Sequence, residues 1–140
     1  MTRDALTARW TDIGEKLVAL AESFPEERFD FRPTAETRSF AEQLRHVAFW
    51  NAYAHDSLRG RPTDGEANEL PADRYATKPA IVSALRSSVD DVATTLAAPG
   101  RALQDGDHET VVSFIEHNGE HYGQLVMYYR LNGLVPPASL

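Results

Sequence analysis

Cysteine is absent from this sequence of 140 residues. Its absence excludes disulfide bonds, thiolate nucleophiles, cysteine-ligated zinc and iron–sulfur clusters. Basic side chains are also scarce, because 14 Lys and Arg stand against 21 Asp and Glu and give a formal net charge of −7. A surface built to bind nucleic acid or an anionic membrane carries the opposite balance, so we expect neither nucleic acid nor membrane as a partner.

Long apolar runs are absent as well. No stretch approaches the about 20 residues that a membrane-spanning helix needs. The first residues, MTRDALTARWTD, are amphipathic and carry acids early, unlike a secretory signal. We therefore expect a soluble, cytoplasmic protein, and the length suits a single domain over residues 1–140.

What the sequence does contain is helical periodicity. Apolar residues that recur at steps of three and four lie on one face of a helix. Four stretches follow this pattern: residues 6–24, 40–59, 78–98 and 110–131. No stretch alternates for long enough to predict a strand, so the sequence predicts an all-α four-helix bundle.

Helix ends and connections can also be placed from the sequence. Ser39 and Glu42 have the spacing of a capping box, which predicts a helix that begins just after Ser39. Thr77 is placed to cap the third helix, and Asp107 the fourth. The connection over residues 61–76 shows neither the helical nor the strand period of apolar residues, and it is long for a compact domain. It predicts a crossover, after which the third helix runs parallel to the second.

Two histidines on the predicted fourth helix carry the first chemical signal. His117 and His121 are four residues apart, so their rings lie on one face, one turn apart. Two imidazoles placed in this way can converge on a metal ion. The same face carries Phe114 and Leu125 and is therefore predicted to point inward. The alternative is an ordinary pair of core or surface histidines with hydrogen-bonded side chains.

A third histidine strengthens the metal interpretation. His46 lies on the predicted second helix, close in angle to several aromatic residues. If the second helix packs against the fourth, three neutral imidazoles could bind Zn²⁺, Ni²⁺ or a similar divalent ion, with water in the open position. His46 could instead be an isolated helix histidine. His55 is half a turn out of phase with His46, and His108 lies in an acidic turn, so neither is predicted to be a ligand.

The segment HNGEH does not have the HExxH pattern of zinc proteases. Asn118 stands where those enzymes carry their general-base glutamate. Glu120 is near His117 in angle, but a helix-surface acid is the simpler interpretation. The sequence therefore assigns no catalytic acid or base.

Two segments resemble a known family. They are FRPTAETRSFAEQLRHVAFW, with its L-x-H step, and FIEHNGEHYGQLVMYYRLNGLVPP, with H-x-x-x-H-x-G-Q-L. Together with the helix order and the long crossover, they resemble the DinB-like (DinB/YfiT) superfamily of metal-binding four-helix bundles. The resemblance implies that His46, His117 and His121 are the metal ligands and that Gln124 lies near the site. It also implies a homodimer.

The resemblance leaves the reaction open. Some members look like metal-dependent transferases or isomerases that use low-molecular-weight thiols, and others like hydrolases. The first hypothesis is therefore a metal-dependent thiol transferase or hydrolase with a small-molecule substrate, its pocket formed by the side chains Gln43, Trp50, Tyr53, Gln124 and Tyr128. The alternative is a non-enzymatic, stress-linked metal-binding or scaffold dimer with a closed metal site. A metal-free dimer that binds an apolar ligand would need histidines that point apart.

The end of the fourth helix offers a surface for the homodimer. Tyr128 and Tyr129 are adjacent and cannot both lie on one narrow face. We expect one of them to point outward and, with Tyr122, to support an interface between two copies. The alternative is that these are scattered surface aromatics.

Overall fold

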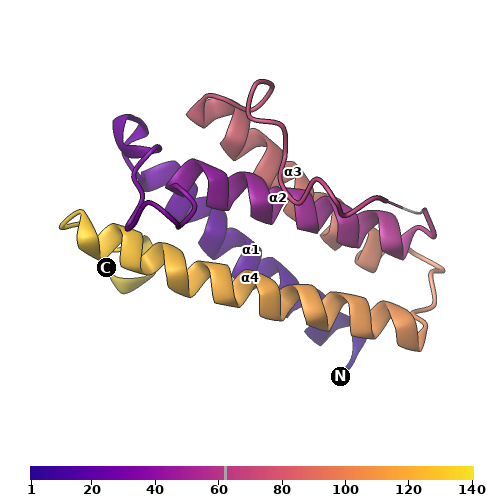
Figure 1. Ribbon diagram of the computed structural model, residues 1–140. Coiled ribbons are helices and arrows are strands. Elements are labelled where there is room, and N and C mark those ends of the chain that lie inside the picture. The colour runs from indigo at the N-terminus through magenta and orange to yellow at the C-terminus, as the bar shows by residue number, and fades with distance from the viewer. Residues whose placement is uncertain (62) are drawn as a thin grey trace.

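Four α-helices make up the computed structural model, which describes residues 1–61 and 63–140 (Figure 1). They are α1 (Arg3–Ser23), α2 (Phe40–Leu58), α3 (Lys78–Ala97) and α4 (Asp105–Leu131), with short 3₁₀ turns η1 (Glu26–Arg28) and η2 (Pro137–Ser139). The described residues contain no strand, so the all-α prediction is confirmed. None of the helices in this part of the chain is long and apolar enough to cross a membrane.

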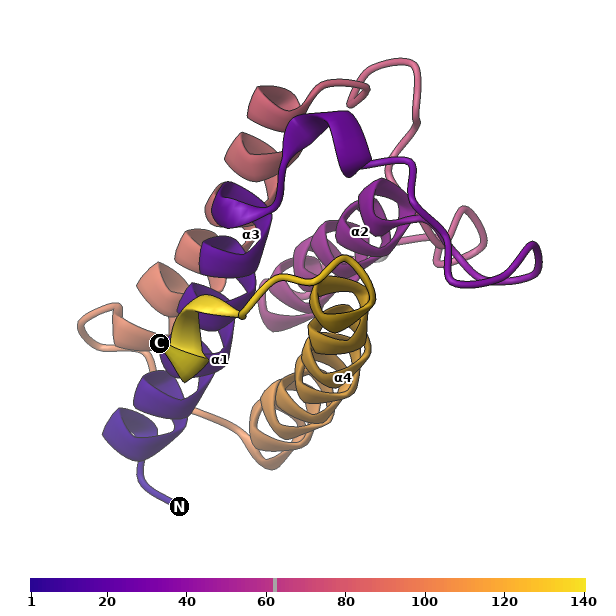
Figure 2. The same ribbon diagram turned by 90° about the vertical axis from the view of Figure 1, so that its left-hand side faces the viewer.

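The chain path is that of a bundle with one long crossover. α1 and α4 run in one direction, and α2 and α3 run in the other (Figure 1). α2 contacts α3, which runs parallel to it, and α4, which runs antiparallel to it. α1 likewise contacts the parallel helix α4 and the antiparallel helix α3. In the end-on view of Figure 2, α1 and α3 lie on one side and α2 and α4 on the other. The predicted parallel arrangement of α2 and α3 is therefore confirmed.

Two of the three predicted helix starts are confirmed. The Ser39 hydroxyl accepts from the Glu42 N–H at 3.1 Å, and the Ser39 N–H donates to the Glu42 carboxylate at 2.8 Å. The Thr77 hydroxyl caps α3. The prediction for Asp107 is wrong, because the cap of α4 is Gln104, whose N–H donates to Asp107 at 3.0 Å. The Asp107 carboxylate accepts from the N–H of the cap residue, whereas a cap side chain accepts from an N–H inside the first turn. A short acid near the helix start suits either position, so composition did not separate the two.

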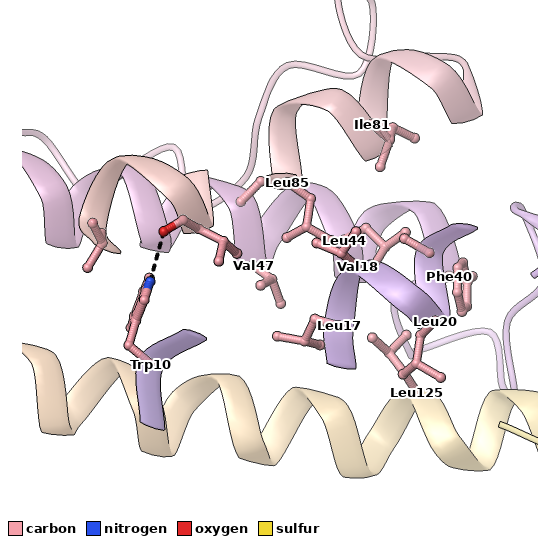
Figure 3. Packing of buried hydrophobic residues seen from close by; sticks show 14 of the residues in the cluster. Trp10, Leu17, Val18, Leu20, Phe40, Leu44, Val47, Ile81, Leu85 and Leu125 are labelled. Atoms are coloured by element: carbon pink, nitrogen blue, oxygen red, sulfur yellow. Dashed lines mark hydrogen bonds between the residues drawn. The ribbon is translucent and has the colours of Figure 1, made fainter. Parts of the chain in front are cut away.

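The core lies along the middle of the bundle, where apolar side chains from all four helices meet (Figure 3). Trp10 of α1 is fully buried, and its indole N–H donates to the Val89 carbonyl of α3 at 2.9 Å. One turn further along α1, Gly14 lies against Val89 so closely that any side chain there would collide with it. This contact brings α1 and α3 together and leaves the facing surfaces of α2 and α4 to hold the polar residues described below.

The prediction that one of two adjacent tyrosines points outward is wrong. Tyr128 and Tyr129 are 4% and 1% exposed. The Tyr129 hydroxyl donates to the Leu20 carbonyl of α1, and the Tyr128 hydroxyl donates to the Arg38 carbonyl ahead of α2, each at 2.6 Å. Neighbours cover α4 from two directions, so the buried face at this end is wider than a single stripe.

Candidate metal centre

Three histidines from two helices meet between α2 and α4. The ring centroids of His46 and His121 are 4.6 Å apart, those of His117 and His121 are 4.5 Å apart, and those of His46 and His117 are 5.1 Å apart. One nitrogen from each ring lies within 4.8 Å of the other two nitrogens. The predicted juxtaposition is therefore present, and it follows from two local facts. His117 and His121 are one helical turn apart, and α2 packs on the face of α4 that carries them.

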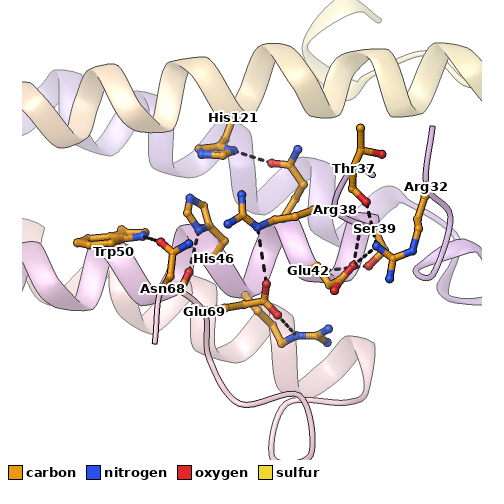
Figure 4. A network of polar contacts seen from close by, with 12 residues as sticks. Arg32, Thr37, Arg38, Ser39, Glu42, His46, Trp50, Asn68, Glu69 and His121 are labelled. Atoms are coloured by element: carbon orange, nitrogen blue, oxygen red, sulfur yellow. Dashed lines mark hydrogen bonds and ion pairs between the residues drawn. The ribbon is translucent and has the colours of Figure 1, made fainter. Parts of the chain in front are cut away.

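Hydrogen bonds set the proton positions on two of the rings. His46 Nδ1 lies 2.8 Å from the backbone carbonyl of Asn68, and His121 Nδ1 lies 2.6 Å from the side-chain oxygen of Gln43 (Figure 4). Both partners are oxygens that can only accept. The proton of each neutral ring is therefore on Nδ1, and Nε2 carries the free lone pair. The Gln43 assignment is consistent, because its Nε2 donates to Gln124 Oε1 at 2.6 Å.

The donor set fits a divalent metal ion. The Nε2 atoms of His46 and His117 are 3.1 Å apart. Imidazole nitrogens bound to tetrahedral zinc at about 2.0–2.1 Å stand about 3.3 Å from one another, so the His46–His117 pair is already near this spacing. The separations to His121, which lie within 4.8 Å, would shorten if the rings turn towards an ion. His117 Nδ1 is buried without a hydrogen-bond partner among the described residues, so this ring, unlike the other two, has no outer acceptor to orient it. Neutral imidazoles are the ligand type that zinc and nickel prefer, and two of the three here have the outer hydrogen-bond partner that is usual for metal ligands.

Burial keeps the three rings neutral. Desolvation lowers the pKa of His46 from 6.5 to about 4 and that of His121 to about 3. It also lowers the pKa of His117. The neighbouring rings and the Arg38 guanidinium lower the pKa of His121 further. Lone pairs on neutral rings are what a metal needs, so the site is prepared for a cation at neutral pH.

Asn68 belongs to the candidate site but was not predicted from the sequence. It lies in the crossover between α2 and α3 and adopts a positive φ of 62°. Its carbonyl accepts from His46, and its side-chain oxygen accepts from the Trp50 indole N–H at 2.7 Å (Figure 4). Asparagine tolerates the left-handed conformation better than most residues. An asparagine beside glycine and acids in a long connection was the only available signal, and it predicted a turn rather than a contact with the site.

The comparisons with known proteins agree with this arrangement. The family model of the DinB superfamily matches residues 9–125, a segment that includes all three histidines and the crossover. The chain belongs to the DinB superfamily. No protein with a curated description matches it.

A cavity of about 630 Å³ in this DinB protein is lined by none of the three histidines but does include Gln43, the partner of His121. Gln43 connects the two, because one end of its amide faces His121 and the residue also lines the cavity. The lining residues are Pro33, Glu36, Thr37, Arg38, Gln43, Gln124, Met127 and Tyr128. The cavity thus includes three of the five residues predicted to form the pocket.

The other two predicted pocket residues lie elsewhere around the DinB site. Trp50 and Tyr53 are outside the lining of this cavity and pack with Phe114 in an aromatic cluster. The Trp50 ring centroid is 6.5 Å from that of His46 and 6.4 Å from that of His117. Trp50 therefore lies against the histidines where the crossover covers it, and Tyr53 packs behind Trp50.

The remaining candidates lie outside the DinB histidine cluster. His55 contacts the Thr95 hydroxyl of α3 through Nε2 at 3.0 Å. His108 lies in the first turn of α4, and Glu120 is exposed on the same helix. None of the three belongs to the group of converging donors found among the described residues.

Replacing Gln43 with leucine is expected to lower the affinity of this DinB protein for zinc by 10- to 100-fold, the effect typical of losing an outer hydrogen-bond partner. The leucine cannot accept from His121 Nδ1, so the ring loses both its fixed orientation and its tautomer. Gln43→Glu serves as the matched variant, because a carboxylate still accepts from Nδ1, and it should retain most of the affinity. Competition titration against a zinc indicator measures both. Equal affinity for Gln43→Leu and the unmodified protein would show that the contact is incidental.

Proposed function

We propose that His46, His117 and His121 hold one divalent ion, zinc or nickel, and that this DinB protein is a metal-dependent enzyme. The proposed reaction is either the transfer of a low-molecular-weight thiol to a small-molecule substrate or the hydrolysis of a small-molecule substrate. The observation that supports this proposal is the convergence of three neutral imidazoles, two of them with their Nε2 lone pairs fixed by acceptors on Nδ1.

An open site favours an enzyme over a scaffold. Among residues 1–61 and 63–140, the converging group contains three donors and no carboxylate. A structural zinc site is normally closed by four protein ligands, whereas a catalytic site keeps a position for a water or substrate. When bound, the ion would act as a Lewis acid and lower the pKa of a water or thiol that occupies that position. The cavity lined by Gln43 and Gln124 would hold a small molecule next to the site.

The protein's own residues would orient and enclose the reacting groups. Gln43 and the Asn68 carbonyl hold two of the rings with Nε2 directed inward. Trp50 covers the histidines on one side, and Gln124 and Tyr128 present polar atoms on the cavity side. Rings positioned in advance lose little freedom when a ligand arrives, which is how a small site gains affinity and rate.

Elemental analysis followed by X-ray absorption at the zinc edge tests the proposal. We expect one zinc or nickel per chain, nitrogen ligands in the first shell, and a new sulfur ligand at about 2.3 Å after addition of a small thiol. Turnover of a thiol with an electrophile, or of an activated ester, should then require the metal and be absent in stripped protein. A metal whose ligands do not change with excess thiol, in a protein without turnover, would instead establish the scaffold alternative.

We also propose that the protein works as a homodimer in the cytoplasm, where small thiols stay reduced. Support for association comes from Met127 and Leu131, which are 55% and 56% exposed and lie four residues apart on α4. Sedimentation equilibrium of the metal-loaded protein should give twice the chain mass, and Leu131→Glu should shift it towards one chain. A single-chain mass for the unmodified protein at tens of micromolar would contradict the dimer.

A further inference from the structure

One cationic side chain faces both the histidine cluster and the cavity. Arg38 immediately precedes Ser39, the cap of α2, and lines the cavity beside Gln43 and Gln124. Figure 4 shows its guanidinium extending towards His46 and His121. Its positive charge contributes to the lowered pKa of all three histidines. The side chain is 36% exposed and is therefore accessible from the cavity.

The charges around Arg38 leave one positive charge in excess. Arg32 pairs with Glu42 at 2.6 Å. Glu69 is shared by two arginines, with Arg45 Nε at 3.6 Å and Arg38 Nε at 3.7 Å. Arg45 is the more buried of the two, at 10% exposed, and depends on Glu69 for compensation. Three guanidinium groups thus face two carboxylates in this local group, and Arg38 is the arginine that borders the cavity.

The remaining acid at the cavity does not cancel this excess. Glu36 also lines the cavity, but its side chain is exposed to solvent, which screens its charge. It forms no ion pair with Arg38 in the part of the chain that the structure describes. A ligand in the cavity would therefore contact the Arg38 guanidinium, whose positive charge is only partly compensated, because Arg38 shares Glu69 with Arg45.

A metal ion would make the need for an anion stronger. Three neutral imidazoles leave a divalent ion with its full charge, and Arg38 adds a further positive charge close by. Like charges in a partly buried site repel more strongly than in water. A negatively charged ligand that reaches both the open position and the guanidinium would remove this repulsion.

We propose that the cavity binds a small molecule that carries a carboxylate, with the carboxylate on Arg38 and the reactive end of the molecule facing the histidines. This inference rests on the proposed metal site. The planar guanidinium matches a carboxylate in a two-pronged hydrogen bond. Counted apart from the metal ion, Arg38 contributes one excess positive charge, which the single charge of a carboxylate neutralises. The volume of about 630 Å³ is in the range of small-molecule sites.

The test uses cobalt-loaded protein and a series of ω-mercaptocarboxylates, each matched by the mercaptoalcohol of equal length. Thiolate-to-cobalt absorption reports binding, and the affinities are corrected for the thiol pKa values. We expect the best carboxylate to bind at least about tenfold more tightly than its alcohol, since a hydrogen bond between charged groups is stronger than one to a neutral hydroxyl. Arg38→Gln should reduce this preference to about twofold or less without loss of cobalt. Arg130→Gln removes the same charge from an exposed site outside the cavity and should keep the preference.

The outcomes separate this inference from the metal proposal. Failure to take up cobalt would overturn the metal site and the carboxylate site together. Uptake of cobalt with equal affinity for acid and alcohol would overturn only the carboxylate site. A preference that survives in Arg38→Gln would also overturn it, because the acid would then be chelating the metal. If Arg38→Gln folds poorly, Arg38→Met serves as the second variant, because it also removes the charge but keeps the apolar part of the side chain. Loss of the preference in Arg38→Met would support the proposal, and a retained preference would overturn it.

Discussion

Replacing His121 with alanine is expected to lower the affinity for zinc by at least 100-fold, more than the loss of any outer hydrogen-bond partner. The ring is 8% exposed and lies within 4.6 Å, centroid to centroid, of both other histidines. Without it, two imidazoles from different helices remain, and neither Gln43 nor the neighbouring Leu125 can replace the lost nitrogen. Two ligands would leave the ion weakly held at micromolar concentrations.

His55→Ala is the matched control for that experiment. This variant also removes a histidine side chain, but His55 is on α2, contacts Thr95 of α3 and lies outside the cluster. Both variants are measured by competition against a zinc chelator, with helix content followed by circular dichroism. His55→Ala should bind zinc like the unmodified protein. A His121→Ala variant that stays folded and keeps its affinity within threefold would show that His121 is not a ligand.

Acidification is expected to destabilise the metal-free protein strongly between pH 7 and pH 5. The pKa values of His46 and His121 are about 4 and about 3 in the folded state, against 6.5 ordinarily. Below pH 6.5 the unfolded chain therefore binds protons that the folded chain does not, and the free energy of unfolding falls as the pH falls. At pH 5 each ring accounts for a loss of about 2 kcal/mol. The stabilisation is complete above pH 6.5 and disappears as the pH approaches the folded pKa values.

Urea unfolding of the metal-free protein at pH 7 and pH 5 measures this effect. Other groups also titrate at the lower end of this range: the raised pKa of Glu69 acts in the opposite direction, because the folded state then holds the proton more tightly. The histidine contribution is therefore isolated by comparison. His46→Ala should lose about 2 kcal/mol less between the two pH values than the unmodified protein. Parallel pH profiles for the two proteins would refute the assignment to His46.

The crossover does more in this fold than connect two helices. A parallel α2 and α3 require a long return path, and this path brings Asn68 against His46 and Trp50. Gly65 of the same segment lies against the Trp50 ring, where a side chain would collide with it. The topology of the bundle and the orientation of a proposed metal ligand are therefore coupled. A change in crossover length should therefore displace Asn68 from His46 and Trp50 while leaving the packing of the core intact.

The sequence by itself determined the helices, the capping box at Ser39, the crossover and the three histidines. Each of these follows from short-range rules: the 3.6-residue period, the reach of a side chain to its own backbone, and the one-turn spacing of His117 and His121. The inward-facing stripe on α4 was readable for the same reason.

Only the tertiary structure decided which groups orient those histidines. Gln43 was predicted to lie near the site, but its contact with His121 of α4 was not. The Asn68 carbonyl and the Arg38 guanidinium reach the site from segments whose patterns carry no trace of it, because long-range packing sets their positions. The start of α4 at Gln104 and the burial of both Tyr128 and Tyr129 were also decided by neighbours rather than by periodicity. Local rules predict which residues share a helix face, but contacts between distant segments determine which of them orient a ligand.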